Sequence, residues 1–503
     1  MRPIKIAVVL VVAGFAGVAG ARGQGDVAAF QGLQKAVQKA IQQNDASIAC
    51  ILVSRSEKYE DFGQGPDKDR PGRLGSFDVK MLDRAPRFSD LTADQQKQWR
   101  KQLDFTDPGY VPRAFGSGVV VDASGLILTN YHVVQDATKI FVRLPGGKGS
   151  YADIHAADPR CDLAVLKLLA PHGLLRPITL GDADTLERGQ FVLTLSNPFA
   201  AGFRDGQPSA SFGILSNIRR RAAVHLKEEE RVKPFHYFGT LLQTDTRMHV
   251  GSSGGALLNL QGEMVGLITS LAAIQGIDAP GGFAVPITPT MRRIIDVLKR
   301  GEEVDYGFLG VGFDPPDGSG NGKIGVRLTY VGEGTPAKID GDLVKDDVLL
   351  AVNGRPIHDS DDLYLAIGTH LAGGKIQVTF QRGLTKRNVD ITLAKLHVPG
   401  KPIVSSLGSR PYFRGLRVDY GSLFGQQQPN RPGAFAVGVF VSDVQPNTSA
   451  DRANIKAGDL ITHVNQQRVS TPAAFYQAVD AAKGPLELTL YNIPPTKVLL
   501  KVK

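Results

Sequence analysis

The stretch from Arg247 to Thr269, RMHVGSSGGALLNLQGEMVGLIT, decides how the chain is interpreted. Its second part, ALLNLQGEMVGLIT, places short apolar runs around a Gln-Gly turn, which predicts a β-hairpin. Its first part, GSSGG at 251–255, fits either a flexible surface turn or a loop that presents Ser253 as a nucleophile. A nucleophilic serine needs a general base and a group that orients the base, whereas a flexible turn needs neither.

The composition is that of a globular, turn-rich protein. A chain of 503 residues is too long for one hydrophobic core and predicts roughly two to four domains. Its 57 glycines favour turn-rich β structure over a helical bundle. The net charge of +9 is spread along the chain, and the densest basic cluster, Arg219–Arg221, lies close to the acidic cluster Glu228–Glu230. A nucleic-acid-binding face needs charge of one sign, so we expect no nucleic-acid partner.

The N-terminus has the three parts of a secretory signal. Arg2 and Lys5 supply positive charge, Ile6 to Val18 form a short apolar run, and Ala19-Gly20-Ala21 offers a cleavage site. We predict a signal peptide at residues 1–21 and an exported chain, periplasmic or extracellular. An uncleaved membrane anchor is the alternative. No later apolar run is long enough to cross a bilayer, so no membrane span is expected after signal cleavage.

Only two cysteines are present, Cys50 and Cys161, and both lie in apolar, strand-like runs. In an exported protein they either form a disulfide or remain buried thiols, and the sequence leaves both alternatives open. The sequence contains no metal-ligand spacing and no nucleotide-binding loop. We therefore expect no metal and no cofactor.

Hydrophobic periodicity divides the first part of the chain. Residues 26–44 have helical spacing and precede a strand-like run, whereas 54–114 form a polar insert with one expected helix starting at Thr92. From 116 to 288, short apolar runs alternate with Gly, Asp and Asn turns. This pattern is typical of an antiparallel barrel or sandwich. A helix at 289–300 closes the unit.

An internal repeat follows. The segment 334–367 aligns with 447–479, and Asp347 and Asp459 occupy the same place in the two copies, 112 residues apart. In both, a short helix precedes this Asp, and an apolar strand, an Asn turn and a second helix follow. Such a period is far too long for a solenoid and indicates two copies of a domain of roughly 90 residues. The predicted boundaries are 1–21 for the signal, 22–303 for the β-rich domain with its insert at 54–114, 304–398 for the first repeat, 399–412 for a linker and 413–503 for the second repeat.

Two residues are the candidate partners of Ser253. His132 stands where the apolar strand of GLILTNYHVV breaks into a turn, a place that can hold a side chain rigidly over a cleft. His249 is the rival base, but it lies only four residues from Ser253 on a tight turn. Asp162 leads the apolar run DLAVLKL and is the candidate for orienting the base. Taken alone, Asp162 fits an ordinary turn residue at a strand start equally well.

The chain order His132, Asp162, Ser253 separates two scaffolds. GSSGG also satisfies G-x-S-x-G, the nucleophile elbow of α/β-hydrolases, but that motif needs a helix after the serine and then Asp and His downstream. Here a β-hairpin follows, and every later histidine lies in the repeats. His, Asp and Ser in this order on a β scaffold form the chymotrypsin arrangement. The flexible glycines let the N–H groups of Gly251 and Ser253 point at one spot, so these are the expected oxyanion-hole donors.

Together the motifs carry a family resemblance. GSGVVVDASGLILTNYHVV, DLAVLKL, LSNPF, ILSNIRR, LLQTD, GSSGGALLNLQGEMVGLIT and GGFAVPI resemble the HtrA/Deg serine proteases, and YGFLGVGF resembles the opening of that family's first PDZ domain. The resemblance covers the mature chain apart from 54–114. It implies a mainly β chain, with a chymotrypsin-like double β-barrel protease domain followed by two α+β PDZ domains. It also implies His132 as base, Asp162 as orienting acid and Ser253 as nucleophile.

Three positions near the serine depart from the residues that are usual in the family. Asn is usual where Ser252 stands, Pro is usual where Val250 stands, and Gly is common where Ser196 stands. These changes leave the three triad residues intact and concern the loop that carries the oxyanion-hole donors.

The repeats resemble peptide-binding domains. A PDZ domain adds an extended C-terminal peptide as a strand and captures its carboxylate with N–H groups of a Gly-containing loop. FLGV at 308–311 and GLRV at 415–418 resemble such loops, although an ordinary strand opening with a Gly is the alternative. The expected peptide-binding residues are Leu309, Gly310, Val311, Leu416, Arg417 and Val418. The family also implies unfolded protein substrates, C-terminal peptides as partners, and a homo-oligomer that is a trimer or larger.

Two functions are consistent with these features. The first is an exported, ATP-independent serine endopeptidase that cleaves unfolded or damaged proteins through an acyl-enzyme. The second is a catalytically weak or inactive chaperone or scaffold that binds exposed polypeptide segments. The presence of all three triad residues favours the protease.

Overall fold

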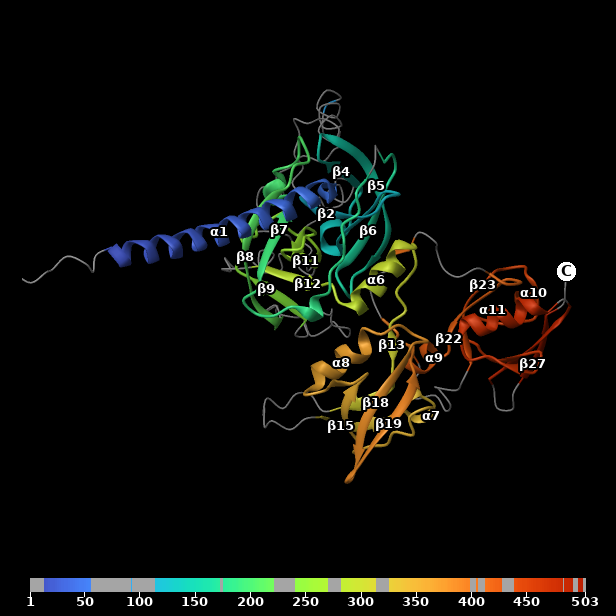
Figure 1. Ribbon diagram of the computed structural model, residues 1–503. Coiled ribbons are helices and arrows are strands. Elements are labelled where there is room, and N and C mark those ends of the chain that lie inside the picture. The colour runs from blue at the N-terminus through green and yellow to red at the C-terminus, as the bar shows by residue number, and fades with distance from the viewer. Residues whose placement is uncertain are drawn as a thin grey trace, which may run out of the picture. The chain divides into compact units, whose positions relative to one another are not determined.

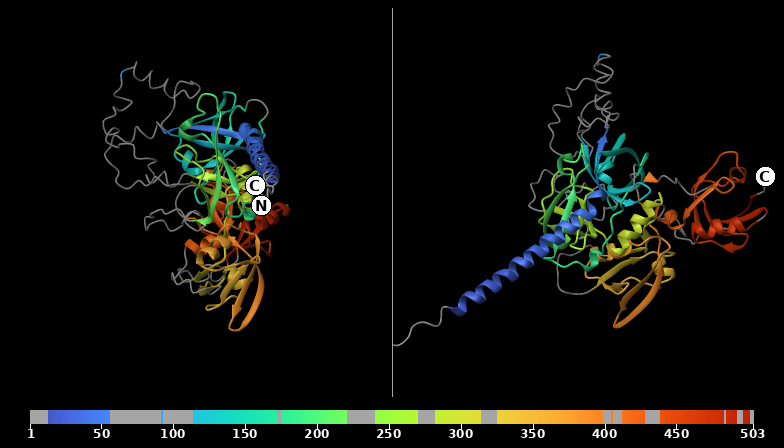
Figure 2. Two further views of the ribbon diagram at one scale, coloured as in Figure 1. Left: turned by 60° about the vertical axis from the view of Figure 1, so that its left-hand side comes forward. Right: turned by 45° about the horizontal axis from the view of Figure 1, so that its top comes forward.

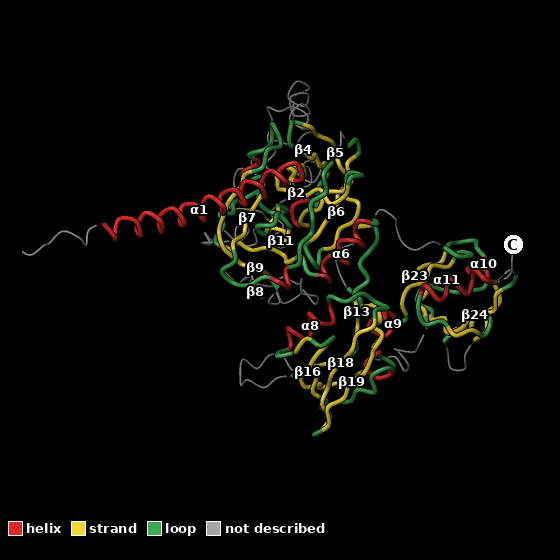
Figure 3. Tube along the Cα trace, viewed as in Figure 1, coloured by secondary structure: helices red, strands yellow, loops and turns green. Residues whose placement is uncertain are grey.

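The computed structural model describes residues 13–55, 92, 114–171, 175–220, 240–269, 282–313, 325–398, 404–405, 412–427, 438–482, 484–491 and 496–500 (Figure 1). Most of the insert 54–114, including the helix expected from Thr92, lies outside these residues. Strands dominate the described chain, as Figure 3 shows. The expectation of a mainly β protein is confirmed.

The first six strands form a barrel. They are β1 (Ile48–Ser54), β2 (Ala114–Asp122), β3 (Leu126–Asn130), β4 (Lys139–Leu144), β5 (Lys148–Asp158) and β6 (Leu163–Leu168). The order β5-β4-β1-β2-β3-β6 closes because β5 also pairs with β6. Strand β1 is buried along its whole length, since the IACILVS run lies between β2 and β4. A short strand from the predicted linker, β21 (Val404–Ser405), pairs with the outer edge of β5.

The second barrel is also closed. Its strands are β7 (Phe191–Ser196), β8 (Ser209–Arg220), β9 (Leu241–Thr244), β10 (Ala256–Leu258), β11 (Met264–Thr269) and β12 (Gly282–Pro286), in the order β10-β11-β12-β9-β8-β7. The hairpin predicted from ALLNLQGEMVGLIT is the β10–β11 pair, with Gly262 at φ +81° in its turn. Both strands of this hairpin are fully buried, so the barrel core holds the segment that follows Ser253.

One long helix precedes the barrels. Helix α1 covers Ala13–Asn44, which extends the predicted helix towards the N-terminus through the predicted signal cleavage site. Its last turn is anchored, because the Asn44 side-chain amide donates to the Gly262 carbonyl at 2.9 Å. Farther back the helix reaches beyond the barrels, as Figure 2 shows, and Phe30 is 74% exposed. In the described part of the chain, no helix combines the length and the apolar character needed to cross a membrane.

The two repeats have the same sheet topology. After helix α6 (Pro289–Lys299), the first repeat holds β13 (Gly307–Phe308), β14 (Val311–Phe313), β15 (Val326–Val331), β16 (Val348–Val352), β17 (Arg355–Pro356), β18 (Lys375–Arg382), β19 (Thr385–Thr392) and β20 (Ala394–Lys395), with helices α7 (Pro336–Ile339) and α8 (Ser360–Gly368). The second holds β22 (Leu416–Tyr420), β23 (Val439–Val444), β24 (Leu460–Val464), β25 (Gln467–Arg468), β26 (Leu486–Leu490) and β27 (Thr496–Leu500), with helices α9 (Ser422–Gln427), α10 (Ser449–Arg452) and α11 (Pro472–Ala481). The orders β14-β15-β16-β18-β19 and β22-β23-β24-β26-β27 correspond strand by strand.

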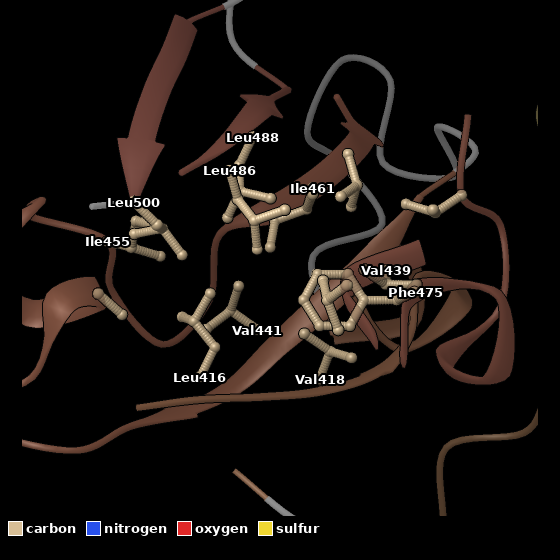
Figure 4. Packing of buried hydrophobic residues seen from close by; sticks show 14 of the residues in the cluster. Leu416, Val418, Val439, Val441, Ile455, Ile461, Phe475, Leu486, Leu488 and Leu500 are labelled. Atoms are coloured by element: carbon tan, nitrogen blue, oxygen red, sulfur yellow. The ribbon is translucent and has the colours of Figure 1, made fainter. Parts of the chain in front are cut away.

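Polar residues repeat along with the strands. The carboxylate of Asp347 accepts a hydrogen bond from the Val344 N–H, and the carboxylate of Asp459 accepts one from the Lys456 N–H, each at 2.9 Å. The predicted Asn turns also match, because Asn353 and Asn465 both have positive φ, at 50° and 47°. Figure 4 shows the core of the second repeat, where Phe475 of α11 packs against the sheet.

The described chain divides into two compact units. The first holds most of both barrels. The second holds Pro289–Lys503 together with Ile154–Val165, the segment that contains the end of β5, the β5–β6 turn and the start of β6. The turn that carries Asp162 therefore belongs to the same unit as the two repeats.

Candidate active site

The loop before Ser253 is a tight turn and not a flexible segment. The Ser252 N–H donates to the His249 carbonyl at 2.9 Å, which closes a four-residue turn. Gly251 is the third residue of this turn and has φ +94°, the conformation that a type II turn requires at that place. A side chain on Gly251 would also meet the Asn197 carbonyl at 2.8 Å. Glycine is required here by both conformation and space.

The same turn aims one N–H group away from the protein's own acceptors. The Phe199 N–H donates to the Val250 carbonyl at 2.7 Å. Because a trans peptide bond is planar, its C=O and N–H point in opposite directions, so the Gly251 N–H faces away from Phe199. Gly251 is buried, yet within the described residues its N–H has no acceptor. A buried and unpaired donor of this kind is what an oxyanion hole needs.

A residue that the sequence analysis did not single out holds this loop in place. Ser117 of β2 is fully buried, and its hydroxyl donates to the Gly251 carbonyl at 2.7 Å and accepts from the Asn197 N–H at 2.8 Å. Its backbone N–H donates to the Ser253 carbonyl at 2.8 Å. Only the long-range pairing reveals this role, since a serine between two strand glycines carries no catalytic signature in the sequence.

His132 lies in a single helical turn, α4 (Tyr131–Val134), directly after β3. Arg55 fixes the end of this turn by donating to the carbonyls of Val133 and Gln135 at 3.0 and 2.8 Å. A Cβ atom on Gly116 of β2 would lie 2.6 Å from Val133 Cγ1 and 3.3 Å from the Ser253 carbonyl oxygen. The helical turn of His132 and the loop of Ser253 therefore both pack against Gly116.

Asp162 lies in the turn between β5 and β6 and is 5% exposed. Leu168, at the end of β6, donates to the carbonyl of Gly125, just before β3. β3 and β6 are neighbours in the sheet, and this bond joins the end of β6 to the start of β3. The two strands therefore run in opposite directions, and β6 begins beside the end of β3. Asp162, just before β6, is thus at the same edge of the barrel as His132, just after β3.

The rival base and the unusual neighbours of Ser253 have other partners. His249 is exposed, and its ring stacks on Phe199 with centroids 5.2 Å apart. Two of the positions that depart from the family contact each other, because the Ser196 hydroxyl donates to the Ser252 hydroxyl at 3.3 Å. The Ser252 hydroxyl also accepts the His249 N–H at 3.2 Å. This pair braces the turn that orients Gly251. Among the described residues, no group of three or more His, Cys, Asp and Glu side chains is arranged to hold a metal.

The predicted peptide-binding loops are not equivalent to each other. Gly310 accepts a hydrogen bond from Gly332, and Gly415 accepts the corresponding one from Gln445. The two glycines have φ values of +87° and +90°. The counterpart of Leu309-Gly310-Val311 is therefore Arg414-Gly415-Leu416, and the predicted GLRV segment is offset from FLGV by two residues. The matching partner strand, and not the glycine pattern, fixes this register.

The first repeat presents an open strand edge. Val311 lies opposite Val331, and the Gly332 N–H donates to the Gly310 carbonyl at 3.0 Å. This pattern makes Val311–Val331 a non-hydrogen-bonded pair, so the N–H and C=O of Val311 point away from β15. Strand β14 is the edge of its sheet. Within the described residues, the edge therefore offers backbone groups without a protein partner to an added strand.

The second repeat closes the same edge on itself. Leu416 lies opposite Val444 in the same kind of pair, but its outward N–H and C=O both bond to the backbone of Phe413, at 2.8 and 2.7 Å. Farther along the strand, the Val418 N–H donates to the Tyr476 hydroxyl of α11 at 3.4 Å. Arg417 stacks on Tyr412, 3.9 Å from the ring centroid. The protein's own groups thus bond to the outward-facing backbone of this strand.

Comparisons with known proteins agree with this architecture. Residues 116–267 match the model of the trypsin-like peptidase domain. Residues 307–393 and 404–491 each match a PDZ domain. The second match begins inside the predicted linker, at the strand that pairs with β5.

Relatives that match most of the chain share one functional name. A probable periplasmic serine endoprotease, DegP-like, of Chlamydia muridarum is 32% identical over 378 residues, which cover 73% of this chain and 70% of that protein. A protein of the same name from Pseudomonas fluorescens is 31% identical, with 87% and 86% covered. The solved HtrA-type protease AlgW with a tripeptide is 22% identical with a TM-score of 0.47, covering 72% of this chain and 97% of that one. This chain is a serine endopeptidase that belongs to the HtrA/DegP family, with a trypsin-like peptidase domain followed by two PDZ domains.

Proposed function

We propose that Ser253, His132 and Asp162 perform the peptide hydrolysis. The Ser253 hydroxyl attacks the scissile carbonyl carbon while His132 takes up its proton, and His132 then gives that proton to the leaving amine. The acyl-enzyme that remains is hydrolysed by a water molecule that His132 activates in the same way. Asp162 accepts a hydrogen bond from the other ring nitrogen and stabilises the imidazolium. The meeting of the β3 end and the β6 start at one edge of the barrel supports these roles.

The single observation that carries the proposal is the direction of the Gly251 N–H. It is buried, held by the bond from Phe199 to Val250, and without an acceptor among the described residues. Together with the Ser253 N–H, it would bind the oxyanion of the tetrahedral intermediate. Removing one such donor costs an enzyme about 10²–10³ in kcat. A loop already in this arrangement favours a working protease over an inactive scaffold.

The substrates we propose are unfolded or damaged proteins in an exported compartment. The periplasmic names of the relatives and the signal-like N-terminus support this location. The open edge at Val311 supports recognition of C-terminal peptides by the first repeat. Because the edge at Leu416 is paired within the second repeat itself, this repeat should bind such peptides only weakly. A trimer or larger homo-oligomer remains a prediction from the family.

Two measurements on the purified mature chain test the function together. Unfolded casein should be cleaved without ATP, and a fluorophosphonate probe should label one residue, identified as Ser253 by peptide mass mapping. Ser253→Ala should abolish both cleavage and labelling while casein binding persists. Casein binding without cleavage or labelling in the parent protein would instead support the chaperone or scaffold function.

A further inference from the structure

The turn that carries Asp162 has a strained backbone. Asp162 has φ +56°, a left-handed conformation that residues other than glycine seldom adopt. Strain of this kind persists only where the surroundings over-determine it. The surroundings that do so here are buried and come from the turn itself and from the first repeat.

Asp158, at the end of β5, ties the turn together and is 1% exposed. One carboxylate oxygen accepts the Arg160 N–H at 2.8 Å, and the Asp158 carbonyl accepts the Cys161 thiol at 3.7 Å. The other carboxylate oxygen accepts the hydroxyl of Tyr306. Burial raises the pKa of the Asp158 carboxyl, and the hydrogen bond from Tyr306 opposes that rise. The turn is thus bonded on one side by its own backbone and on the other by Tyr306.

Arg160 adds a second contact between the turn and the first repeat. Its guanidinium carbon lies 4.3 Å from the ring centroid of Tyr306 and 5.6 Å from that of Tyr364 on α8. It also donates to the Tyr364 hydroxyl at 3.4 Å. Arg160 is 4% exposed, although arginine is rarely buried without a carboxylate or an aromatic partner. We call Asp158, Arg160, Tyr306 and Tyr364 the Tyr306 cluster.

The two tyrosines are themselves fixed in the first repeat. Tyr306 directly precedes β13, and its carbonyl accepts the Leu396 N–H at 2.8 Å. Tyr364 belongs to α8, the longest helix of the first repeat. The segment Ile154–Val165 accordingly forms one compact unit with the repeats. The turn that carries Asp162 is therefore bonded to Tyr306, which lies 144 positions after Asp162 in the chain.

We propose that the Tyr306 cluster positions Asp162 for catalysis, so that Tyr306 and Arg160 act on the reaction through the catalytic acid without touching substrate. This inference rests on the proposed role of Asp162. A shift of the β5–β6 turn would leave substrate binding intact but would weaken the support that Asp162 gives to His132. The expected signature is a lower kcat at constant KM.

The test uses the full mature chain and an amidated, internally quenched casein-derived peptide. Tyr306→Phe removes the hydroxyl but keeps the ring, and should lower kcat about tenfold, because small misplacements of catalytic groups are costly, with KM within about twofold. Tyr364→Phe removes only the acceptor for Arg160 and should lower kcat in the same direction by a smaller factor. It carries the test if Tyr306→Phe does not fold. The matched control is Tyr412→Phe, because Tyr412 also donates to a carboxylate, that of Asp443, beside a stacked arginine. This control should keep the parent kcat.

A double-mutant cycle separates positioning from general stability. Asp162→Asn alone should lower kcat by about 10⁴, and adding Tyr306→Phe should lower it little further, since groups that act as a unit are not additive. If Tyr306→Phe lowers kcat by the same factor in the parent and in the Asp162→Asn variant, the inference is overturned. If Asp162→Asn lowers kcat but Tyr306→Phe and Tyr364→Phe keep the parent kcat, this inference is overturned while the triad assignment stands. An Asp162→Asn enzyme at the parent rate would overturn the triad assignment, and this inference with it.

Discussion

The Phe199 N–H donates to the Val250 carbonyl at 2.7 Å, and this bond determines where the Gly251 N–H points. If the Val250–Gly251 peptide plane turned over, the Phe199 bond would be lost and the N–H would leave the oxyanion site. Val250 itself is 46% exposed, so its side chain does little to restrain the plane. The backbone bond and the Ser117 contact to Gly251 carry that restraint.

Gly251→Ala should therefore damage turnover severely. The new methyl group would lie 2.8 Å from the Asn197 carbonyl and 2.8 Å from the Phe115 ring, at a φ of +94° that alanine avoids. We expect kcat to fall by about 10², the size of effect seen when an oxyanion donor is displaced. The control is Gly189→Ala, which has a similar φ of +88° but no heavy atom within 4 Å of the added methyl group. Equal losses from both variants would show that strain alone, and not the oxyanion donor, explains the effect.

The two repeats should differ in peptide binding. Gly310 and Gly415 have similar φ values, and a methyl group on either would collide with a threonine at a helix N-cap, Thr335 of α7 or Thr448 of α10. Gly310→Ala distorts the open edge and should lower the affinity for a fluorescent C-terminal peptide at least about tenfold. Gly415→Ala should leave this affinity unchanged. Fluorescence anisotropy measures both, with an amidated peptide as the weakly bound control. A larger loss from Gly415→Ala would contradict the closed edge of the second repeat.

Asp347 and Arg382 should make the first repeat acid-sensitive. Burial alone would raise the pKa of Asp347, but hydrogen bonds from Arg382, at 2.8 Å to each carboxylate oxygen, and from Val344 outweigh it and lower that pKa. A lowered folded-state pKa contributes stability that is present above the unfolded value, about 3.9, and is lost as pH falls through the folded value. Arg382→Met should lower the local free energy of unfolding by about 2 kcal/mol at neutral pH. Below pH 4, the difference in this free energy between the variant and the parent should shrink.

Hydrogen exchange of β16 and β18 amides measures this local free energy within the full chain. The control is Arg327→Met, since the Arg327–Asp346 pair is exposed and 3.8 Å long. Loss of this exposed pair should lower the local free energy of unfolding by less than about 1 kcal/mol. A cost for Arg382→Met that stays the same from pH 7 to pH 3 would contradict the assignment.

The thiols should be inert in the folded protein. Cys50 and Cys161 are both free and buried. Burial raises the pKa of Cys50 to about 12, and burial also raises that of Cys161. An aromatic disulfide reagent at pH 8 should therefore react with neither thiol in the native chain and with both after denaturation in guanidinium chloride. Protein purified without reductant that shows no thiol after denaturation would instead indicate a disulfide.

The sequence predicted well whatever depends on local pattern. The β-hairpin after Ser253 and the two copies marked by Asp347 and Asp459 both follow from short motifs. The register between the repeats was beyond it: FLGVGF offers two glycines with apolar neighbours, and only the pairing of β14 with β15 and of β22 with β23 shows that Gly310 corresponds to Gly415.

Long-range partners were also beyond the sequence. Ser117 is joined to Gly251 and Ser253 across more than 130 residues, and Tyr306 is joined to Asp158 across 148 residues. Both residues lie in stretches that carry the family resemblance, GSGVVVDASGLILTNYHVV and YGFLGVGF, but neither stretch predicts the contact. The chemistry of each contact appears only when two distant strands or turns meet.

The most direct test of the account is the kinetics of Ser253→Ala, His132→Ala and their combination on an unfolded substrate. Each single change should lower kcat by about 10⁶, and the double change should lower it little further, because the two residues act as one unit. Ser252→Ala is the matched control, since its hydroxyl braces the turn through Ser196 and His249 without attacking substrate, and it should cost far less. A purified Ser253→Ala chain that cleaves at the parent rate would contradict the account.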